Sequence, residues 1–172
     1  MMFRELTKND IEVRVQSVKA NGLVLLLYKN ARVDMNILDE TVGAENWQRE
    51  HYECKGNLFC RVGIRTCLKD NETVAEWVYK SDCGTESNTE AQKGEASDSF
   101  KRACFNWGIG RELYTSPFIW IPAEKCNINN GKCYDRFSIE KIIIEDKQIK
   151  ALAIWNDTKN TRAFVWQAVD EQ

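Results

Sequence analysis

The segment from Glu86 to Arg111 constrains the fold more than any other part of this chain, because it has the periodicity of one long amphipathic helix. Successive helical residues turn by about 100°. On that wheel Lys101, Arg102 and Phe105 fall on one side. The opposite side carries a narrow apolar stripe made of Ala96, Phe100, Ala103 and Trp107, with Cys104 at its margin. The pattern predicts a helix that packs this stripe against a core and turns the two cations and Phe105 outward.

Both ends of this helix carry recognisable signals. Ser87 and Glu90 have the spacing of a capping box, in which two side chains satisfy backbone N–H groups of the first turn. Gly108 follows the last apolar position and suits the left-handed conformation that ends many helices.

The segments before this helix alternate in the manner of β-strands. Three strands are predicted at Gln48–Lys55, Leu58–Leu68 and Thr73–Lys80, with a hairpin turn at Gly56-Asn57 between the first two. In the middle strand Cys60, Val62 and Ile64 share one face, whereas Arg61 and Arg65 share the other. We therefore expect an α+β fold, an antiparallel β-meander with a long helix packed across it.

The flanking regions complete the expected organisation. Before the meander we predict a helix at Thr7–Lys19 with Thr7 or Asn9 as its N-cap, a buried strand at Leu23–Tyr28 and a helix at Asp34–Val42. After Pro122 we predict three strands at Phe137–Glu145, Ile149–Trp155 and Ala163–Val169. The expected division is a first domain over residues 1–122 and a small β-rich C-terminal extension over residues 123–172.

Composition limits the class of protein. The chain has 172 residues, a net charge of −2 and a pI near 5.6, so any nucleic-acid site must be a local patch rather than a basic coat. The seven cysteines form no CxxC pair, which favours reduced thiols in the cytoplasm. No apolar signal segment or membrane-length apolar run is present, so we expect no membrane partner.

Three kinds of chemistry have weak support. No GxxxxGK[ST] loop occurs, which argues against a nucleotide-hydrolysing enzyme. A metal-dependent nuclease remains an alternative, since Glu53 and Lys55, and likewise Glu145 and Lys147, have E-x-K spacing, although both pairs fall at expected turns. His51 with Cys54, Cys60 or Cys67 fits no standard zinc spacing, so we expect no metal and no cofactor.

A local nucleic-acid site has broader support. Cations along a groove neutralise phosphates, and an aromatic ring stacks on a base. The candidate residues are Lys101, Arg102 and Phe105 on the helix, Arg61 and Arg65 on the middle strand, Lys55 in the hairpin, and Arg32 before the second helix. Surface salt bridges with the many acids explain the same cations, and the residues alone favour that simpler explanation.

Four stretches in order resemble the single-strand annealing family of recombination proteins, which includes the eukaryotic Rad fifty-two repair protein and the phage annealing proteins called Sak. They are ARVDMNILDETVGAENW, IRTCLKDNE, SDCGTESNTEAQKGEASDSFKRA and FKRACFNWGIGRELY, which together span roughly residues 31–114. The part after Pro122 resembles extensions of phage-type members only loosely.

This resemblance implies a ring-shaped homo-oligomer that binds single-stranded DNA in a basic groove and anneals complementary strands without ATP, rather than an enzyme. It implies a role in homologous recombination and DNA repair, with a recombinase, an exonuclease or a single-strand-binding protein as possible partners. Lys101 and Arg102 match the groove-lining Lys-Arg pair of the family, and Arg32 and Arg65 match two further arginines. Phe105 stands where eukaryotic members carry a basic residue, which suggests stacking or packing there. A non-DNA, ring-forming interaction protein remains an alternative.

Overall fold

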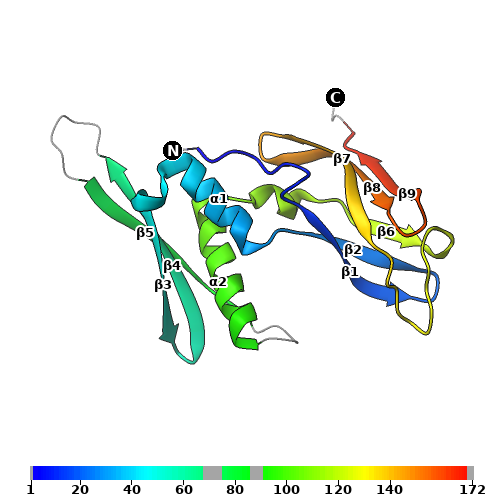
Figure 1. The fold of residues 1–172 in the computed structure, drawn as a ribbon, viewed down its shortest axis with the longest axis horizontal. Helices are drawn as coiled ribbons and strands as arrows, with labels where there is room; N and C mark the ends of the chain where they lie inside the picture. The colour runs from blue at the N-terminus through cyan, green and yellow to red at the C-terminus, as the bar shows by residue number, and fades with distance from the viewer. Residues whose placement is uncertain (1, 68–74, 86–90, 170–172) are drawn as a thin grey trace. The chain divides into compact units, whose positions relative to one another are not determined.

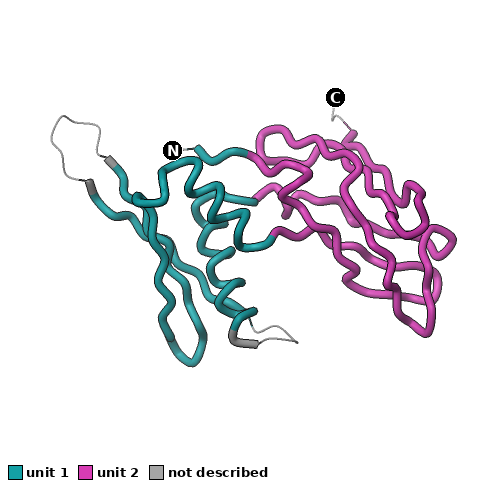
Figure 2. The backbone as a smooth tube through the Cα atoms, viewed as in Figure 1, with its two compact units in different colours: residues 1–4, 30–110 teal, residues 5–29, 111–172 magenta. Residues whose placement is uncertain are grey.

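The computed structural model describes residues 2–67, 75–85 and 91–169 of the chain. Helices and antiparallel strands are both present, so the predicted α+β class is confirmed (Figure 1). The chain divides into two compact units, residues 1–4 with 30–110 and residues 5–29 with 111–172 (Figure 2). No helix in the described part of the chain is long and apolar enough to cross a membrane.

The first unit contains a three-stranded antiparallel sheet in the order β3-β4-β5 and two helices. Its elements are α1 (Ala31–Val42), the short 3-10 helix η1 (Ala44–Asn46), β3 (Trp47–Cys54), β4 (Asn57–Cys67), β5 (Ala75–Cys83) and α2 (Ala91–Trp107). Helix α2 packs on β4 and β5, and α1 contacts α2 and β3. The core between helices and sheet consists of Ile37, Leu38, Cys60, Val62, Ile64, Phe100, Ala103 and Cys104, all fully buried.

The predicted alternation of the middle strand is confirmed, and so is the Asp34–Val42 helix, which begins earlier, at Ala31. Asn30 caps α1, because its side-chain oxygen accepts a hydrogen bond from the backbone N–H of Arg32 at 3.0 Å. The hairpin turn lies one residue earlier than predicted. Cys54 pairs with Asn57, and Lys55 and Gly56 form the turn with φ of 53° and 75°. Two positive φ values are typical of a type I′ hairpin.

The predicted long helix is present in the described residues, and its end is the predicted one. It runs over Ala91–Trp107, and Gly108 follows it with φ of 98°, as expected for the C-terminal position. The N–H of Gly108 bonds to the carbonyl of Phe105, and the N–H of Ile109 bonds to that of Cys104. The predicted capping box at Ser87 and Glu90 lies outside the described residues.

The second unit contains two three-stranded antiparallel sheets, β1-β2-β6 and β7-β8-β9. Its elements are β1 (Glu12–Lys19), β2 (Gly22–Tyr28), η2 (Arg111–Thr115), β6 (Ile119–Pro122), η3 (Ala123–Lys125), β7 (Phe137–Glu145), β8 (Gln148–Asn156) and β9 (Thr161–Gln167). The three strands predicted after Pro122 are therefore confirmed, with small shifts at their ends. Asp146 and Lys147, with φ of 51° and 61°, form the turn between β7 and β8.

The helix predicted at Thr7–Lys19 is wrong. Thr7 and Asp10 close a turn, since the backbone N–H and the hydroxyl of Thr7 both donate to the Asp10 carboxylate at 2.8 Å. Glu12–Lys19 is strand β1, paired with β2. The apolar residues Val13 and Val15 alternate with polar ones, and this period of two, together with their β-branched side chains, outweighs the capping signal of Thr7.

Strand β2 forms where the apolar Leu23–Tyr28 run was predicted, and Leu23, Leu25 and Leu27 are buried. It is the central strand of its sheet, paired with β1 on one side and β6 on the other. The pairing of β2 with β6 joins two segments that lie far apart in the sequence. As a result, the second compact unit contains β1 and β2 together with residues 111–172.

Candidate nucleic-acid interface

The basic end of α2 is positioned by an apolar stripe close to the one predicted. Phe100 and Ala103 are fully buried, and so is Cys104, which was expected only at the margin. Trp107 is half-buried and anchors the end of the helix, because its indole N–H donates to the carbonyl of Val62 at 3.0 Å. Phe100 packs against the ring of Trp47 with centroids 6.1 Å apart. These contacts fix which side of the helix turns away from the sheet.

The three outward residues of α2 differ in exposure. Arg102 is exposed, whereas Lys101 and Phe105 are half-buried. Lys101 and Arg102 precede Phe105 by four and three positions, so all three side chains share one region of the helix surface. The helix wheel therefore predicts correctly that these three residues share one side of α2. Phe105 is only half-buried there, so its predicted exposure is confirmed in part.

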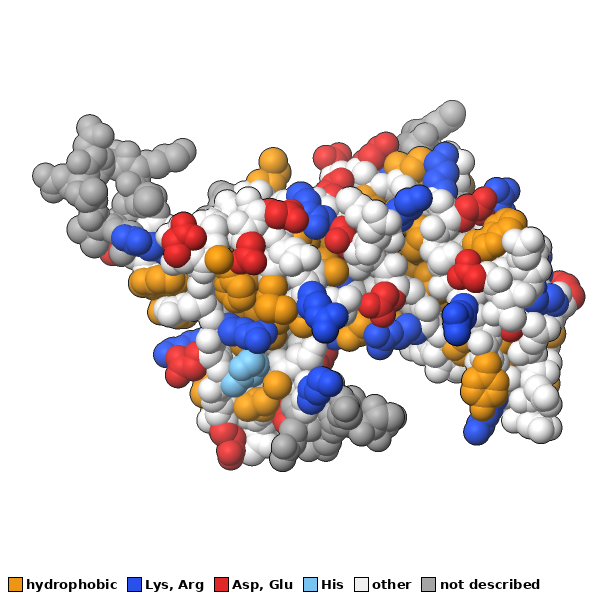
Figure 3. Space-filling model, in the orientation of Figure 1, with side chains coloured by type: hydrophobic (Ala, Val, Ile, Leu, Met, Phe, Trp, Pro, Cys, Tyr) orange, Lys and Arg blue, Asp and Glu red, His pale blue; other side chains and the backbone are white. Residues whose placement is uncertain are grey.

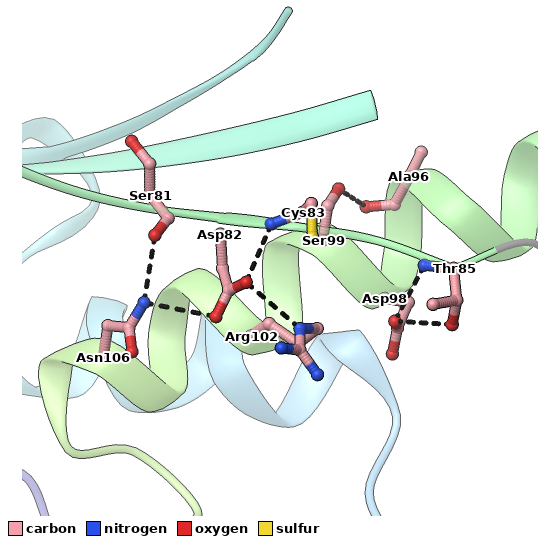
Figure 4. Close-up of polar contacts among 9 residues, drawn as sticks. All are labelled: Ser81, Asp82, Cys83, Thr85, Ala96, Asp98, Ser99, Arg102 and Asn106. Atoms are coloured by element: carbon pink, nitrogen blue, oxygen red, sulfur yellow. Dashed lines mark hydrogen bonds and ion pairs between the residues drawn. The ribbon is translucent and has the colours of Figure 1, made fainter. Parts of the chain in front are cut away.

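Arg102 is tied to the end of β5 by Asp82 (Figure 4). The guanidinium Nε donates to Asp82 Oδ1 at 3.2 Å. The same carboxylate accepts the backbone N–H of Cys83 at 2.8 Å and the amide of Asn106 at 3.4 Å, and Asn106 also donates to the carbonyl of Ser81. Arg102 thus has a defined direction along the seam between α2 and β5, and the carboxylate partly offsets its charge.

A close backbone approach makes this seam possible. A Cβ atom on Gly84 would lie 2.1 Å from the carbonyl oxygen of Glu95, so only glycine fits at this position without a shift. One residue later, the N–H and hydroxyl of Thr85 donate to Asp98 at 3.1 and 3.2 Å. The segment after β5 is therefore held directly against the helix that carries Lys101 and Arg102.

Arg61 and Arg65 lie on the other side of the sheet. On β3 the side chains of Trp47, Arg49 and His51 contact α2: Arg49 lies 4.7 Å from the Phe100 ring centroid and His51 donates to the carbonyl of Ala96 at 3.0 Å. Side chains alternate along strands, so Glu50 and its register partner Arg61 point away from the helices. Arg65 shares the face of Arg61 and is exposed.

Arg61 is engaged in a two-pronged ion pair. Its Nε and Nη2 atoms donate to Glu50 Oε2 at 2.9 and 2.6 Å, and this hydrogen bonding raises the pKa of the guanidinium above its usual value. Arg61 is therefore charged at every working pH. The salt-bridge explanation considered for the surface cations holds for Arg61 and, through Asp82, for Arg102.

The remaining two candidates lie on other elements of the first unit. Lys55 is exposed in the β3–β4 turn, and Arg32 is exposed in the first turn of α1, on the helix side of the sheet. The seven candidates therefore do not form a single cluster. Figure 3 shows one side of the molecule, on which Lys and Arg side chains are interspersed with Asp and Glu, in keeping with the net charge of −2.

Residues 2–131 match the sequence model of the Rad52/22 family of double-strand break repair proteins, which is most of the chain. The chain belongs to this family. The resemblance seen in the four sequence stretches is thereby confirmed at the level of the family. A comparison with curated proteins finds no match.

In this Rad52/22 family member, each E-x-K pair of the alternative nuclease site combines a glutamate near the end of a strand, Glu53 in β3 or Glu145 in β7, with a lysine in the following turn. Lys55 and Lys147 both occupy hairpin turns with positive φ, as expected for the E-x-K pairs. Lys147 also lies 3.9 Å from Glu112, a fully buried carboxylate that accepts the backbone N–H of Leu6 at 2.7 Å. These contacts give Lys147 and Glu112 a packing role within the second unit.

The state of the Cys60 thiol does not favour the alternative zinc site. Cys60 is fully buried, and burial raises the pKa of its thiol to about 11, so it stays protonated at neutral pH. The ligand that zinc requires is the thiolate. Within the described ranges no group of three His, Cys, Asp or Glu side chains is placed to hold a metal ion.

Sequence reasoning missed the residues that orient the arginines, namely Asp82, Asn106 and Glu50. Glu50 pairs with Arg61 only in the observed register, because the predicted turn at Gly56-Asn57 would place Glu50 opposite Gly63. Asp82 lies beyond the predicted end of the third strand at Lys80, since β5 continues to Cys83. Its position beside Arg102 depends on how the strand and α2 pack, which no local pattern reveals.

Proposed function

We propose that this chain binds single-stranded DNA and anneals complementary strands without nucleotide hydrolysis, in homologous recombination and DNA repair. The observation that carries the proposal is the Rad52/22 family match, because it spans both helices and the whole β3-β4-β5 sheet. The family description names double-strand break repair, in keeping with this role.

The phosphate contacts are assigned first to Lys101 and Arg102 on α2 and to Arg32 on α1. All three belong to the helix side of the first unit, and Arg102 is exposed with its direction set by Asp82. A side chain ordered before binding loses less conformational entropy when it meets a phosphate. Phe105, half-buried beside the pair, is assigned to packing beneath it rather than to stacking.

Arg61, Arg65 and Lys55 are assigned to further DNA contacts away from that pair. Arg61 and Arg65 lie on the opposite face of the sheet, and Lys55 lies at the tip of the β3–β4 hairpin. A strand that reaches these residues as well has to pass an edge of the sheet. This assignment therefore predicts a binding length greater than the helix side alone requires.

Annealing then follows from charge neutralisation. Cations along the surface bind phosphates, displace counterions and hold the strand extended, so that its bases are presented for pairing. Two loaded surfaces sample pairing registers in parallel, and the free energy comes from the duplex that forms. The chain acts as a binding protein rather than an enzyme, and no nucleotide or metal takes part.

The assembly proposed is a ring-shaped homo-oligomer of phage type acting in the cytoplasm of a bacterial host. A ring needs the same two complementary surfaces on each subunit. A recombinase, an exonuclease or a single-strand-binding protein is the proposed partner. DNA binding is assigned to the domain over residues 1–122, and residues 123–172 form the small β-rich extension.

An annealing assay tests this function directly. Two complementary oligonucleotides carrying a fluorophore and a quencher are mixed with the protein in EDTA and without ATP. We expect annealing at least tenfold faster than without protein. Spontaneous annealing rates in the presence of protein contradict the proposal, and degradation of the strands only after Mg²⁺ is added supports a nuclease instead.

A further inference from the structure

The face of the β3-β4-β5 sheet that points away from the helices carries an exposed aromatic cluster. Tyr79 is 43% exposed, and Trp77 and Tyr52 are each 37% exposed. In register Gly63 pairs with Tyr79, Arg65 with Trp77, and Tyr52 with Phe59, so these residues share one side of the sheet. We call this surface the aromatic face. It consists of Tyr52, Phe59, Arg61, Arg65, Trp77 and Tyr79.

Tyr79 is held in a fixed position at its centre. Its ring lies against the backbone of Gly63, since a Cβ atom there would be 2.4 Å from the ring carbon Cε1. Its hydroxyl accepts a hydrogen bond from the side-chain amide of Gln48 at 2.8 Å. The ring is thus supported from the sheet side and anchored at its tip, and its exposed remainder faces solvent.

Further rings and cations extend this platform. The rings of Trp77 and Tyr79 are 6.4 Å apart and inclined by 26°, and those of Tyr52 and Phe59 are 5.6 Å apart and inclined by 23°. The guanidinium of Arg61 lies 5.1 Å from the Tyr79 ring centroid. Arg65, opposite Trp77, has no hydrogen bond or ion pair to another described side chain. Among the described residues on this side of the sheet, the two arginines are accompanied by one acid, Glu50.

Sheet stability explains only part of this arrangement. An aromatic ring that covers a strand glycine stabilises a sheet, which accounts for Tyr79 over Gly63. It does not account for the exposure of Trp77 on the edge strand β5 or for the flanking arginines. Exposed aromatics beside cations are the combination that binds single strands, because every base has a π-face and every phosphate a negative charge.

We propose that the aromatic face is a base-stacking site for single-stranded nucleic acid, in which Trp77 and Tyr79 stack on bases while Arg61 and Arg65 meet phosphates. The inference rests on the proposed function, namely that the chain binds single strands. It adds a contact to the bases themselves, on the side of the sheet opposite Lys101 and Arg102. A backbone-only surface would bind a strand without bases equally well.

The test compares an oligo(dT) strand with an abasic strand of the same length, which keeps the phosphates and lacks the bases. Affinities are measured by fluorescence anisotropy for the wild type, Trp77→Ala, Tyr79→Leu and Tyr79→Phe. We expect Trp77→Ala and Tyr79→Leu each to weaken oligo(dT) binding about tenfold and to leave abasic binding unchanged. Tyr79→Phe keeps the ring and stays close to the wild type.

Tyr134→Ala is the matched control, since Tyr134 is an 80% exposed aromatic of the second unit and its removal leaves both affinities unchanged. Circular dichroism and melting verify that each variant is folded, and Trp77→Ala removes only an exposed edge-strand side chain. An unchanged ratio of oligo(dT) to abasic affinity in Trp77→Ala and Tyr79→Leu overturns the proposal. If this ratio is unchanged and light scattering shows an altered oligomeric state in these variants, the stacking proposal is also overturned. The aromatic face is then an interface between copies of the chain.

The wild type separates this inference from the function on which it rests. Wild-type protein that binds both strands equally well leaves the proposed function intact and overturns the stacking site. Wild-type protein that binds neither strand overturns both.

Discussion

The β3-β4-β5 sheet has two faces with different environments: the helices cover one face, and solvent reaches the other. Toward the helices, Cys60, Val62 and Ile64 of β4 are fully buried beneath α1 and α2. Away from the helices, Arg61 and Arg65 of the same strand are exposed beside aromatic rings. Because side chains alternate along β4, its arginines point away from α2, which carries Lys101 and Arg102. The predicted binding residues therefore fall into two groups. Cations grouped by sequence reasoning thus lie on two sides of the sheet, and each group needs its own test.

Cysteine reactivity separates the two faces most strongly. Cys54 is exposed at the end of β3, whereas Cys60 is buried on the helix side, and its pKa of about 11 keeps the thiol protonated up to about that pH. At pH 8 we expect iodoacetamide to modify Cys54 at least about a hundredfold faster than it modifies Cys60. Peptide mass spectrometry measures both rates. In denaturant both cysteines react, and comparable rates in the native protein contradict the assigned faces.

Stability should also differ between the faces. Phe100→Ala removes a fully buried ring between α2 and the sheet and should lower the free energy of unfolding by about 3–5 kcal/mol. Tyr79→Ala removes a ring on the solvent side, and we expect a loss of about 1 kcal/mol. Urea denaturation monitored by circular dichroism measures both. Equal losses would show that the aromatic face is part of the core or of a subunit contact.

The sequence predicts most of what depends on local periodicity. Val62 and Ile64 alternate with Arg61 and Arg65, and this pattern alone gave β4 and its two faces. The stripe through Phe100 and Ala103 gave the buried side of α2, and Gly108 gave its end. The N-terminal error has the same origin, because Thr7 or Asn9 suits a helix N-cap whether the following residues form a helix or extend as β1.

The arrangement of the site needs information that local periodicity does not contain. Asp82 meets Arg102 only because β5 continues to Cys83 and Gly84 lets the chain lie against α2. Tyr79 covers Gly63 only in the observed β4–β5 register. The pairing of β2 with β6, which decides the compact units, joins segments far apart in the sequence. Register and long-range pairing are set by packing of the whole unit.

The central claim is that Lys101 and Arg102 bind DNA phosphates, and a salt titration tests it most directly. The affinity for oligo(dT) is measured over a range of salt concentrations for the wild type, for Lys101→Ala with Arg102→Ala, and for Lys132→Ala with Arg136→Ala, which removes two exposed cations of the second unit. Each lost phosphate contact on a single strand reduces the slope of log affinity against log salt by about 0.7. We predict a slope shallower by about 1.4 for the first pair and an unchanged slope for the second. If the double variant Lys101→Ala with Arg102→Ala has the same slope as the wild type, the assignment of these two residues to phosphate contacts is contradicted.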